Sequence, residues 1–432
     1  MGALRTQKFV KYLPEHGWKP FVLTVQDRYY QTTDPRRLAD VNGAVVQRTS
    51  FWRTPLQLLI DTRNNLRARK KRNEGEFSAV PKSMSGPDDI RRMSYIKRLL
   101  ICLNWLPDDK LYWAISGISK GLRLIKTHNI KLIVVSAPPH SSIILAYILS
   151  KLSGAKLIID FRDPWLLRHE SEDEPFKPKV LLNFERCIEM HILKHASAII
   201  TTNEYFHSAF LREYPFVNAG AVHVVHNGYD SSDFPLESIR SEKKFTISYL
   251  GTFYMQRNPR IFFQALALFM RDNGLNNNEI EVLLIGETDN AGGVPVSEMI
   301  DQAGLRDVVK VMGKVSYARA LEVMCESNLL LLLAPNQPYQ IPAKTYEYMA
   351  AGCPILALTE SGATAALIEL AHAGICVPPH DVQGICFALD RLYEDHLGQA
   401  HTHIADASQF ERRRQTGVLA KVLDHVRLKV AL

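Results

Sequence analysis

The stretch 338–358, PYQIPAKTYEYMAAGCPILAL, contains the features that decide the fold. Its loop leads through Pro342, a residue suited to the first turn of a helix, into a predicted helix over residues 343–351. Gly352 ends that helix, and the short apolar run 354–358 follows it. A buried strand directly after such a helix is typical of α/β domains built on a parallel sheet.

Strand-like apolar runs alternate with helical periods over most of the 432 residues. Most runs lack polar alternation, which predicts parallel strands buried on both faces. The expected strands are 20–25, 44–48, 131–136, 156–160, 198–202 and 222–226, followed by 245–250, 281–286, 308–312, 329–334, 354–358 and 375–378.

The series breaks at the polar stretch 235–244, PLESIRSEKK, which is the predicted linker. We therefore expect two Rossmann-like, doubly wound parallel-sheet domains, residues 1–236 and 245–404, and a final charged helical segment, 405–432. The carboxyl ends of both sheets would face a central cleft, where such folds bind ligands.

Composition is ordinary for a globular protein, with 46% hydrophobic and 22% charged residues. The net charge of +7 suits an anionic partner, although chance surface composition explains it equally well. Six scattered cysteines without a C-x-x-C pair predict reduced thiols rather than disulfides or a zinc site. No apolar run is long enough to span a bilayer, so the predicted location is cytoplasmic, at most peripheral on the inner face of the membrane.

A basic segment at about 50–113 interrupts the alternation. It either lies on anionic lipid headgroups or forms a solvated helical excursion. Nucleic acid is not an expected partner, because no recognition helix or aromatic-interleaved basic sheet accompanies the charge. The basic side chains are Arg63, Arg67, Arg69, Lys70, Lys71, Arg72, Arg91, Arg92, Lys97 and Arg98.

The helix that begins at Ala343 presents unpaired N–H groups to the loop before it, where they attract phosphate or sugar oxygens. Lys344 is placed near such an anion, and Glu347, one turn into the helix, can accept hydrogen bonds from a ribose diol. Ordinary helix capping with solvated side chains explains the pattern equally well.

A second loop follows the strand in 247–266, ISYLGTFYMQRNPRIFFQAL. The strand ends at Gly251, and Asn258 and Pro259 are the predicted N-cap and first residue of the next helix. Arg257 in this loop can grip a diphosphate with its guanidinium, or it can brace the loop.

Three further segments place polar side chains at the ends of predicted strands. The segment 156–166, KLIIDFRDPWL, places Asp160, Arg162 and Asp163 together at the carboxyl end of a strand. These side chains either pair with each other and brace the loop, or they face a polar cleft. The loop 136–142, SAPPHSS, contributes Ser136 and His140. The turn 226–234, HNGYDSSDF, contributes Asn227.

In their order along the chain, these five segments resemble motifs of glycosyltransferase family 4 and the group 1 glycosyltransferases of the GT-B fold. The resemblance implies that Glu347 binds the ribose of a nucleotide-sugar donor and that Arg257 contacts its diphosphate. Arg162 stands where many relatives carry a histidine facing the sugar, so electrostatic support of the reaction, beside Asp163, is its expected role. The sequence departs from the family pattern at Tyr339, where relatives have a second glutamate, and at Thr252, where an arginine is common. The resemblance then implies that backbone amides around Gln340, Ile341 and Ala343 take over the contacts to the sugar ring.

The resemblance also implies a retaining glycosyltransferase that transfers a sugar to a saccharide or lipid-linked acceptor in cell-surface polysaccharide or glycolipid synthesis. No cofactor is expected: the nucleotide-sugar is a substrate, and cationic side chains and helix starts would replace a metal. Two alternatives remain. A catalytically degenerate scaffold would bind a nucleotide-sugar, a membrane or a partner, and a nucleotide-sugar epimerase would need acid/base carboxylates and a histidine in the cleft.

The family normally opens with a buried strand and a glycine-rich turn before the first helix. The present sequence starts at MGALRTQKFVKYL, already at that turn and helix. We therefore expect the first strand of the amino-terminal sheet to be missing, which would leave its neighbours without a partner between them.

Overall fold

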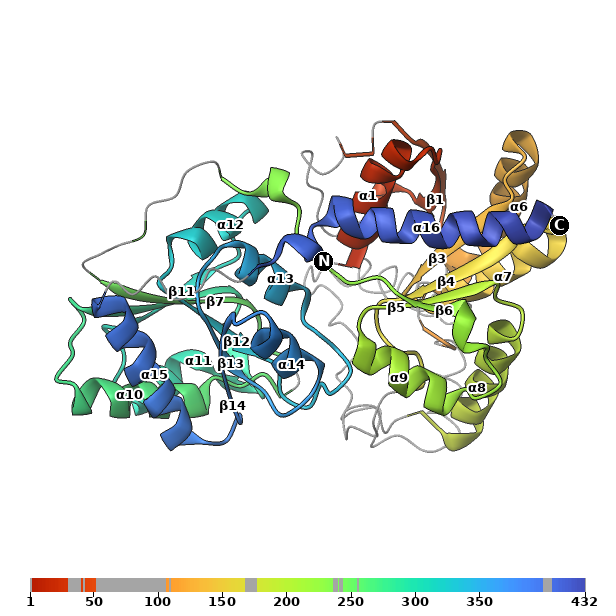
Figure 1. Ribbon diagram of the computed structural model, residues 1–432. Helices are drawn as coiled ribbons and strands as arrows, with labels where there is room; N and C mark the ends of the chain where they lie inside the picture. The colour runs from red at the N-terminus through yellow and green to blue at the C-terminus, as the bar shows by residue number, and fades with distance from the viewer. Residues whose placement is uncertain are drawn as a thin grey trace, which may run out of the picture.

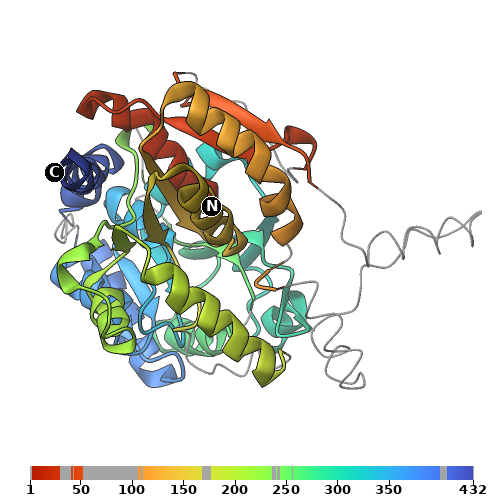
Figure 2. The same ribbon diagram turned by 90° about the vertical axis from the view of Figure 1, so that its right-hand side faces the viewer.

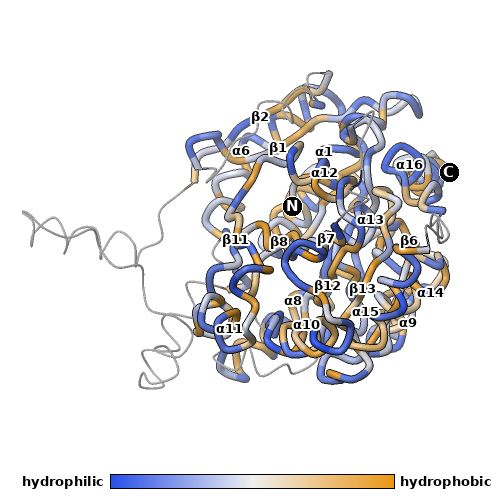
Figure 3. The backbone as a smooth tube through the Cα atoms, turned by 90° about the vertical axis from the view of Figure 1, so that its left-hand side faces the viewer, coloured by the Kyte–Doolittle hydropathy of each residue, from blue (hydrophilic) through white to orange (hydrophobic). Residues whose placement is uncertain are grey.

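The computed structural model describes residues 2–29, 40–41, 43–51, 106–108, 110–167, 177–235, 240, 244–254, 256–398 and 406–431. These residues form two α/β halves that lie side by side (Figure 1). Apolar residues lie along inner strands such as β12 and β13, and hydrophilic residues lie along most of the outer loops (Figure 3). The strands of the cores are therefore the apolar runs of the sequence.

The amino-terminal half contains a parallel sheet of order β3-β4-β5-β6 and a separate parallel pair, β1-β2. Its central strands β4 and β5 are almost wholly buried, as their Leu- and Ile-rich sequences predict. The elements are α1 (Gly2–Tyr12), η1 (Leu13–His16), β1 (Phe21–Val25), η2 (Asp27–Tyr29), β2 (Val45–Thr49), α6 (Leu111–His128), β3 (Leu132–Ala137), α7 (Ser141–Ser153), β4 (Lys156–Phe161), α8 (Lys179–Leu193), β5 (Ala198–Thr201), α9 (Glu204–Glu213), η3 (Ala219–Ala221), β6 (Val222–Val224) and η4 (Ser231–Asp233).

The carboxyl-terminal half contains one parallel sheet of order β11-β8-β7-β12-β13-β14. Strand β12, LLLLL, is buried at every residue, which explains its central place. The elements are β7 (Phe245–Thr252), α10 (Arg260–Asp272), β8 (Ile280–Glu287), β9 (Asn290–Ala291), β10 (Val294–Pro295), α11 (Val296–Gln302), β11 (Val309–Gly313), α12 (Tyr317–Glu326), β12 (Leu329–Leu333), α13 (Ala343–Ala350), β13 (Ile355–Leu358), α14 (Ala363–Leu370), β14 (Gly374–Val377), α15 (Val382–Leu397), η5 (Ser408–Phe410) and α16 (Arg412–Ala431).

The predicted α/β class and the parallel strands are confirmed, and every expected strand has a counterpart within about two residues. The short antiparallel pair β9–β10 was not expected. Helix α10 begins at Arg260 rather than at Pro259, so the predicted N-cap is shifted by one residue. The side chain of Asn258 still caps the helix, because its Oδ1 accepts a hydrogen bond from the N–H of Arg260 at 2.9 Å.

The final helix, α16, begins at Arg412, not near residue 405, and returns to the amino-terminal half. It runs alongside α1 in two perpendicular views (Figures 1 and 2). Leu419 and Leu423 of α16 pack with Phe9 and with Ile158 and Ile200 of the sheet. The last helix is therefore part of the amino-terminal core.

Several expectations fall on residues that the structure does not describe. The basic side chains between Arg63 and Arg98 lie outside the described residues, as do 236–239 and 241–243 of the expected linker. Within the described chain, no helix is long and apolar enough to cross a membrane. The five described cysteines are free thiols, as predicted, although Cys187 is exposed.

Candidate active site in the interdomain cleft

Helix α13 places Glu347 at the centre of the site. The helix begins after Pro342, and no side chain caps its first amides. One turn later the carboxylate of Glu347 is buried, and the Tyr317 hydroxyl donates a hydrogen bond to its Oε1 at 2.8 Å. Tyr317 is the first residue of α12, and sequence reasoning did not find it. The carboxylate is thus held in one orientation by a neighbour on another helix.

Lys344 lies in the first turn of α13, and its ammonium group approaches the end of β7. Burial lowers the pKa of Lys344 to about 8, Glu347 opposes that shift, and Arg257 adds to it. The ammonium lies 6.0 Å from the centre of the Tyr249 ring. A half-buried cation beside uncapped helix amides is a site that favours an anion.

Gly251 is a glycine for a steric reason. A Cβ at this position would lie 2.8 Å from the Tyr249 hydroxyl and 3.1 Å from the Lys344 Nζ. The facing residue on β8, Gly286, has φ +118°, and its Cβ would lie 2.0 Å from the Gly251 carbonyl oxygen. The two strands therefore end in a flat backbone surface beside Lys344.

Arg257 lies in the loop after β7, as expected. Its Nη2 donates to the Gln337 side chain at 3.3 Å, and its guanidinium stacks over the Tyr254 ring at 4.6 Å. The buried Nε has no hydrogen-bond partner among the described residues. An arginine with an unused donor can still take up an anionic ligand.

Asp160 is buried at the carboxyl end of β4, and its carboxylate has partners within the protein. Arg5 of α1 pairs with both carboxylate oxygens, at 2.9 Å and 3.0 Å, and the Ser136 hydroxyl donates to Oδ2 at 2.8 Å. Arg5 also donates to the Asn227 side chain at 3.3 Å and to the His226 carbonyl at 2.6 Å. Through this network, which we call the brace, the Asp160 carboxylate and the Arg5 guanidinium join α1, β4 and the turn at 226–227.

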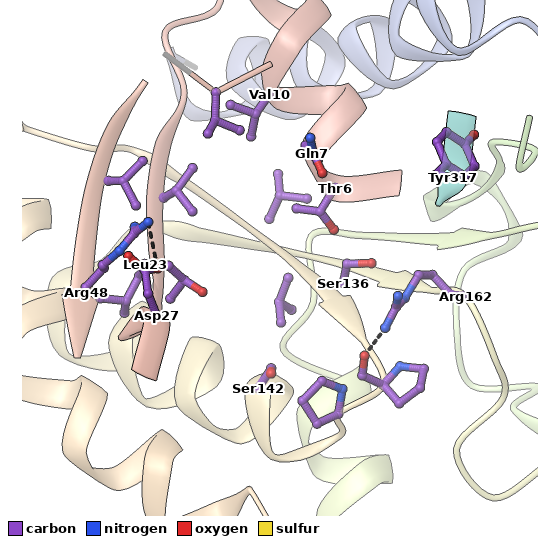
Figure 4. Close-up of a pocket in the computed structure, with 18 of the residues that line it drawn as sticks. Thr6, Gln7, Val10, Leu23, Asp27, Arg48, Ser136, Ser142, Arg162 and Tyr317 are labelled. Carbon is purple, nitrogen blue, oxygen red and sulfur yellow. Dashed lines mark hydrogen bonds and ion pairs between the residues drawn. The ribbon is translucent and has the colours of Figure 1, made fainter. Parts of the chain in front are cut away.

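Arg162 and Asp163 sit above that brace. Arg162 donates to the Pro138 carbonyl, as drawn in the close-up (Figure 4), and burial lowers its pKa while Asp160 and Asp163 oppose the shift. The Asp163 carboxylate accepts a hydrogen bond from the Gln340 side chain at 2.8 Å. Gln340 belongs to the other half, so this hydrogen bond joins the two halves.

The loop that carries Gln340 also contacts the amino-terminal half through its backbone. The Tyr339 carbonyl accepts a hydrogen bond from the Asn203 side chain at 2.9 Å. The side chain of Tyr339 packs against the hydrophobic core of the amino-terminal half. Tyr339 therefore lies at the interface between the two halves. His140, at the N-cap of α7, stacks on Trp165 with ring centres 5.1 Å apart.

One cavity of about 1940 Å³ joins the two halves. It brings together Ser136 and Arg162 from one half with Gly251, Lys344 and Glu347 from the other. The remaining predicted site residues do not line it; they are His140, Asp160, Asp163, Asn227, Arg257, Gln340, Ile341 and Ala343. The roles expected for all of these residues stay predictions.

Sequence reasoning also did not find Arg412, a buried basic residue that interacts electrostatically with Glu347. Arg412, the first residue of α16, is 2% exposed, and its Nε and Nη1 have no hydrogen-bond partner among the described residues. Burial lowers its pKa to about 10, Arg5 adds to that shift, and Glu347 opposes it. The described residues contain no cluster of three or more side chains suited to a metal ion.

Sequence comparison assigns each half to a known family. Residues 82–233 match the family described as Glycosyltransferase Family 4, and residues 244–395 match Glycosyl transferases group 1. The two matches together cover more than half of the chain. A search among curated proteins finds no match.

Solved structures match almost the whole chain at low identity. One is a glycosyltransferase from Rickettsia africae (14% identity, TM-score 0.58, 98% of this chain and 95% of that chain). Another is Anabaena HepE in complex with UDP and glucose (15%, 0.61, 98% and 96%). A third is sucrose-phosphate synthase from Thermosynechococcus elongatus (16%, 0.56, 96% and 99%). The expected GT-B fold is confirmed, and the chain belongs to the group 1 and family 4 glycosyltransferases.

Proposed function

We propose that this protein transfers a sugar from a nucleotide-sugar donor to an acceptor bound against the amino-terminal half. The observation that carries the proposal is the shared cavity, in which Lys344 and Glu347 face Ser136 and Arg162. A similar fold, that of HepE, has been solved with UDP and glucose. The donor would therefore be held by the carboxyl-terminal half.

Each donor group has a chemically suited neighbour in this arrangement. The amides at the start of α13 and the Lys344 ammonium would hold the diphosphate, with Arg257 beside them. The Glu347 carboxylate would accept hydrogen bonds from the ribose hydroxyls. These would replace the hydrogen bond that it accepts from the Tyr317 hydroxyl. These cations would neutralise the leaving diphosphate without a metal ion.

We propose further that the transfer retains the anomeric configuration of the sugar. The proposed acceptor is a saccharide or a lipid-linked molecule of cell-surface polysaccharide or glycolipid synthesis. Arg162 cannot act as a base and would support charge at the reacting centre. No histidine lines the cavity within the described chain, which disfavours an epimerase. An anionic membrane surface remains a proposed partner.

A nucleotide-sugar-binding scaffold without catalysis is the second candidate. It is favoured by Asp160 and Arg162, because both already have partners inside the protein. Release of nucleoside diphosphate from a panel of nucleotide-sugars separates the two candidates. A transferase releases it slowly without acceptor and faster with acceptor, whereas binding without release would establish the scaffold. Proton NMR of the first product formed tests retention.

A further inference from the structure

The chain passes between the two halves twice, and the two passages pair with each other. The first follows the turn at Tyr229 and leads to β7, and the second leads from α15 to α16. The Tyr229 N–H donates to the Phe410 carbonyl at 3.2 Å, and the Arg412 N–H donates to the Tyr229 carbonyl at 2.7 Å. A Cβ at Gly228 would overlap the Phe410 carbonyl oxygen, so the close approach requires a glycine there. The first residue of α16 is therefore fixed at the junction of the halves.

At this junction the side chain of Arg412 is buried next to α13. The Phe410 ring packs edge-on against the ring of Tyr346, the residue before Glu347, with ring centres 5.1 Å apart, and Figure 1 shows the start of α16 beside α13. Arg412 is buried, and its Nε and Nη1 have no hydrogen-bond partner among the described residues. A buried guanidinium is costly unless a negative charge lies near it. The carboxylate that interacts most strongly with Arg412 is that of Glu347.

The two cations that interact with Glu347 would respond differently to a bound donor. Lys344 lines the cavity, where a diphosphate would attract its charge. Arg412 does not line the cavity, so a ligand there leaves its charge to Glu347. Tyr317 and Tyr348, which also interact with Glu347, contribute uncharged hydroxyls. Of these four neighbours, Arg412 alone can go on compensating the charge of Glu347 once a donor is bound.

The charge of Glu347 decides what this side chain can bind. An ionised carboxylate can accept hydrogen bonds from both hydroxyls of a ribose, whereas a protonated carboxyl group uses one oxygen as a donor. Burial favours the protonated form, and a nearby cation opposes it. We propose that Arg412 is a positioning residue for donor binding, which keeps the Glu347 carboxylate negatively charged from the interior of the protein so that it recognises the ribose. This role rests on the proposed function, in which Glu347 binds the ribose of the donor.

The test separates recognition of the ribose from binding of the diphosphate. The full chain is titrated by calorimetry with UDP, GDP and ADP, with the 2′-deoxy form of each, and with inorganic pyrophosphate. For the nucleotide that binds best, the unchanged protein should prefer the ribose form about tenfold over the 2′-deoxy form. Arg412→Met should reduce this preference to about twofold or less, while its affinity for pyrophosphate stays within about threefold of the original.

Two matched variants show whether the charge itself is needed. Arg412→Lys keeps a cation and should retain a preference of about fivefold or more. Arg414→Met, at an exposed position in the first turn of α16, should retain the full preference. An unchanged preference in Arg412→Met would overturn the proposal, as would equal weakening of all three ligands, which indicates a structural role. If no nucleotide binds the unchanged protein, the proposed function is wrong and this role is wrong with it.

A second measurement needs no nucleotide and tests the pairing of Arg412 with Glu347 directly. The effect of Arg412→Met on the melting temperature is compared in the original chain and in a Glu347→Gln chain, and Arg412→Lys is taken through the same cycle in case the methionine variant does not fold. In the original chain the substitution leaves the carboxylate without its cation, whereas in the Glu347→Gln chain it removes a cation that has lost its carboxylate. The shift in melting temperature should therefore be less favourable in the original chain by about 2 °C or more. Equal shifts in the two chains would contradict the pairing.

Discussion

Replacing Lys344 with methionine should stabilise the protein while weakening its affinity for nucleotide diphosphates. Burial lowers the pKa of Lys344 from 10.5 to about 8, so the folded state holds this charge at a cost. At roughly 1.4 kcal/mol per pKa unit, the cost is about 3 kcal/mol below pH 8. Because Lys344 lines the cavity and is only half-buried, we expect a smaller gain, about 2 kcal/mol in the free energy of unfolding at pH 7.

The gain should depend on pH in a defined direction. Between pH 8 and 10.5 the unfolded chain keeps the proton of Lys344 while the folded chain releases it, so the stability of the unchanged protein rises with pH. The advantage of Lys344→Met should therefore fall to about half by pH 9.5. Urea unfolding at pH 7 and at pH 9.5 measures the difference in stability between Lys344→Met and the unchanged protein. Lys421→Met, at an exposed position of α16, is the control.

Nucleoside diphosphate affinity should move in the opposite direction. Loss of one charge-assisted contact should weaken binding by Lys344→Met about tenfold or more, as measured by calorimetry. A variant that is less stable at pH 7, or whose stability gain is the same at both pH values, would refute the assignment of a buried cation. Unchanged diphosphate affinity would refute its role at the anion site.

Three further substitutions test other parts of the structure. Asp160→Asn should lower the free energy of unfolding by about 3–5 kcal/mol, because it leaves the buried Arg5 charge uncompensated; urea unfolding measures the loss, and a change below about 1 kcal/mol would contradict the brace. Gly251→Ala should weaken nucleotide binding about tenfold, since its Cβ meets Tyr249 and the Lys344 ammonium, whereas Gly43→Ala, with open space around it, should bind as before. Burial raises the pKa of Glu189 to about 8, so the folded chain keeps a proton that the unfolded chain loses and stability falls from pH 4.5 to 8; Glu189→Gln should flatten that fall in a thermal-melt series, and an unchanged slope would exclude this cause.

The strands and the positions of Lys344 and Glu347 on one helix could be predicted from the sequence, because their signals are local. Each apolar run is a few residues long, and Lys344 and Glu347 belong to one helix whose start is marked by Pro342. The two halves of the cleft could be expected to face each other because parallel strands present their carboxyl ends at one edge. These inferences needed no knowledge of distant contacts.

The partners of the site residues could not be predicted, because they are far away in the sequence. Arg5 and Asp160 are 155 residues apart, and Tyr317 and Glu347 are 30 apart. No local pattern shows that the charge of Asp160 is directed at α1 rather than at a ligand. Arg412 was missed for the same reason, since α16 returns to the amino-terminal half only through tertiary packing.

The most direct test of the central claim is a calorimetric titration of the full chain with its best nucleotide-sugar, compared with Glu347→Ala and Glu347→Gln. If the Glu347 carboxylate binds the ribose, as proposed, its loss should weaken binding about 30-fold or more in both variants. The glutamine variant keeps the side-chain shape, so its melting temperature shows that the helix remains folded. Affinity unchanged in a folded Glu347→Gln protein would contradict the assignment of α13 as the donor site.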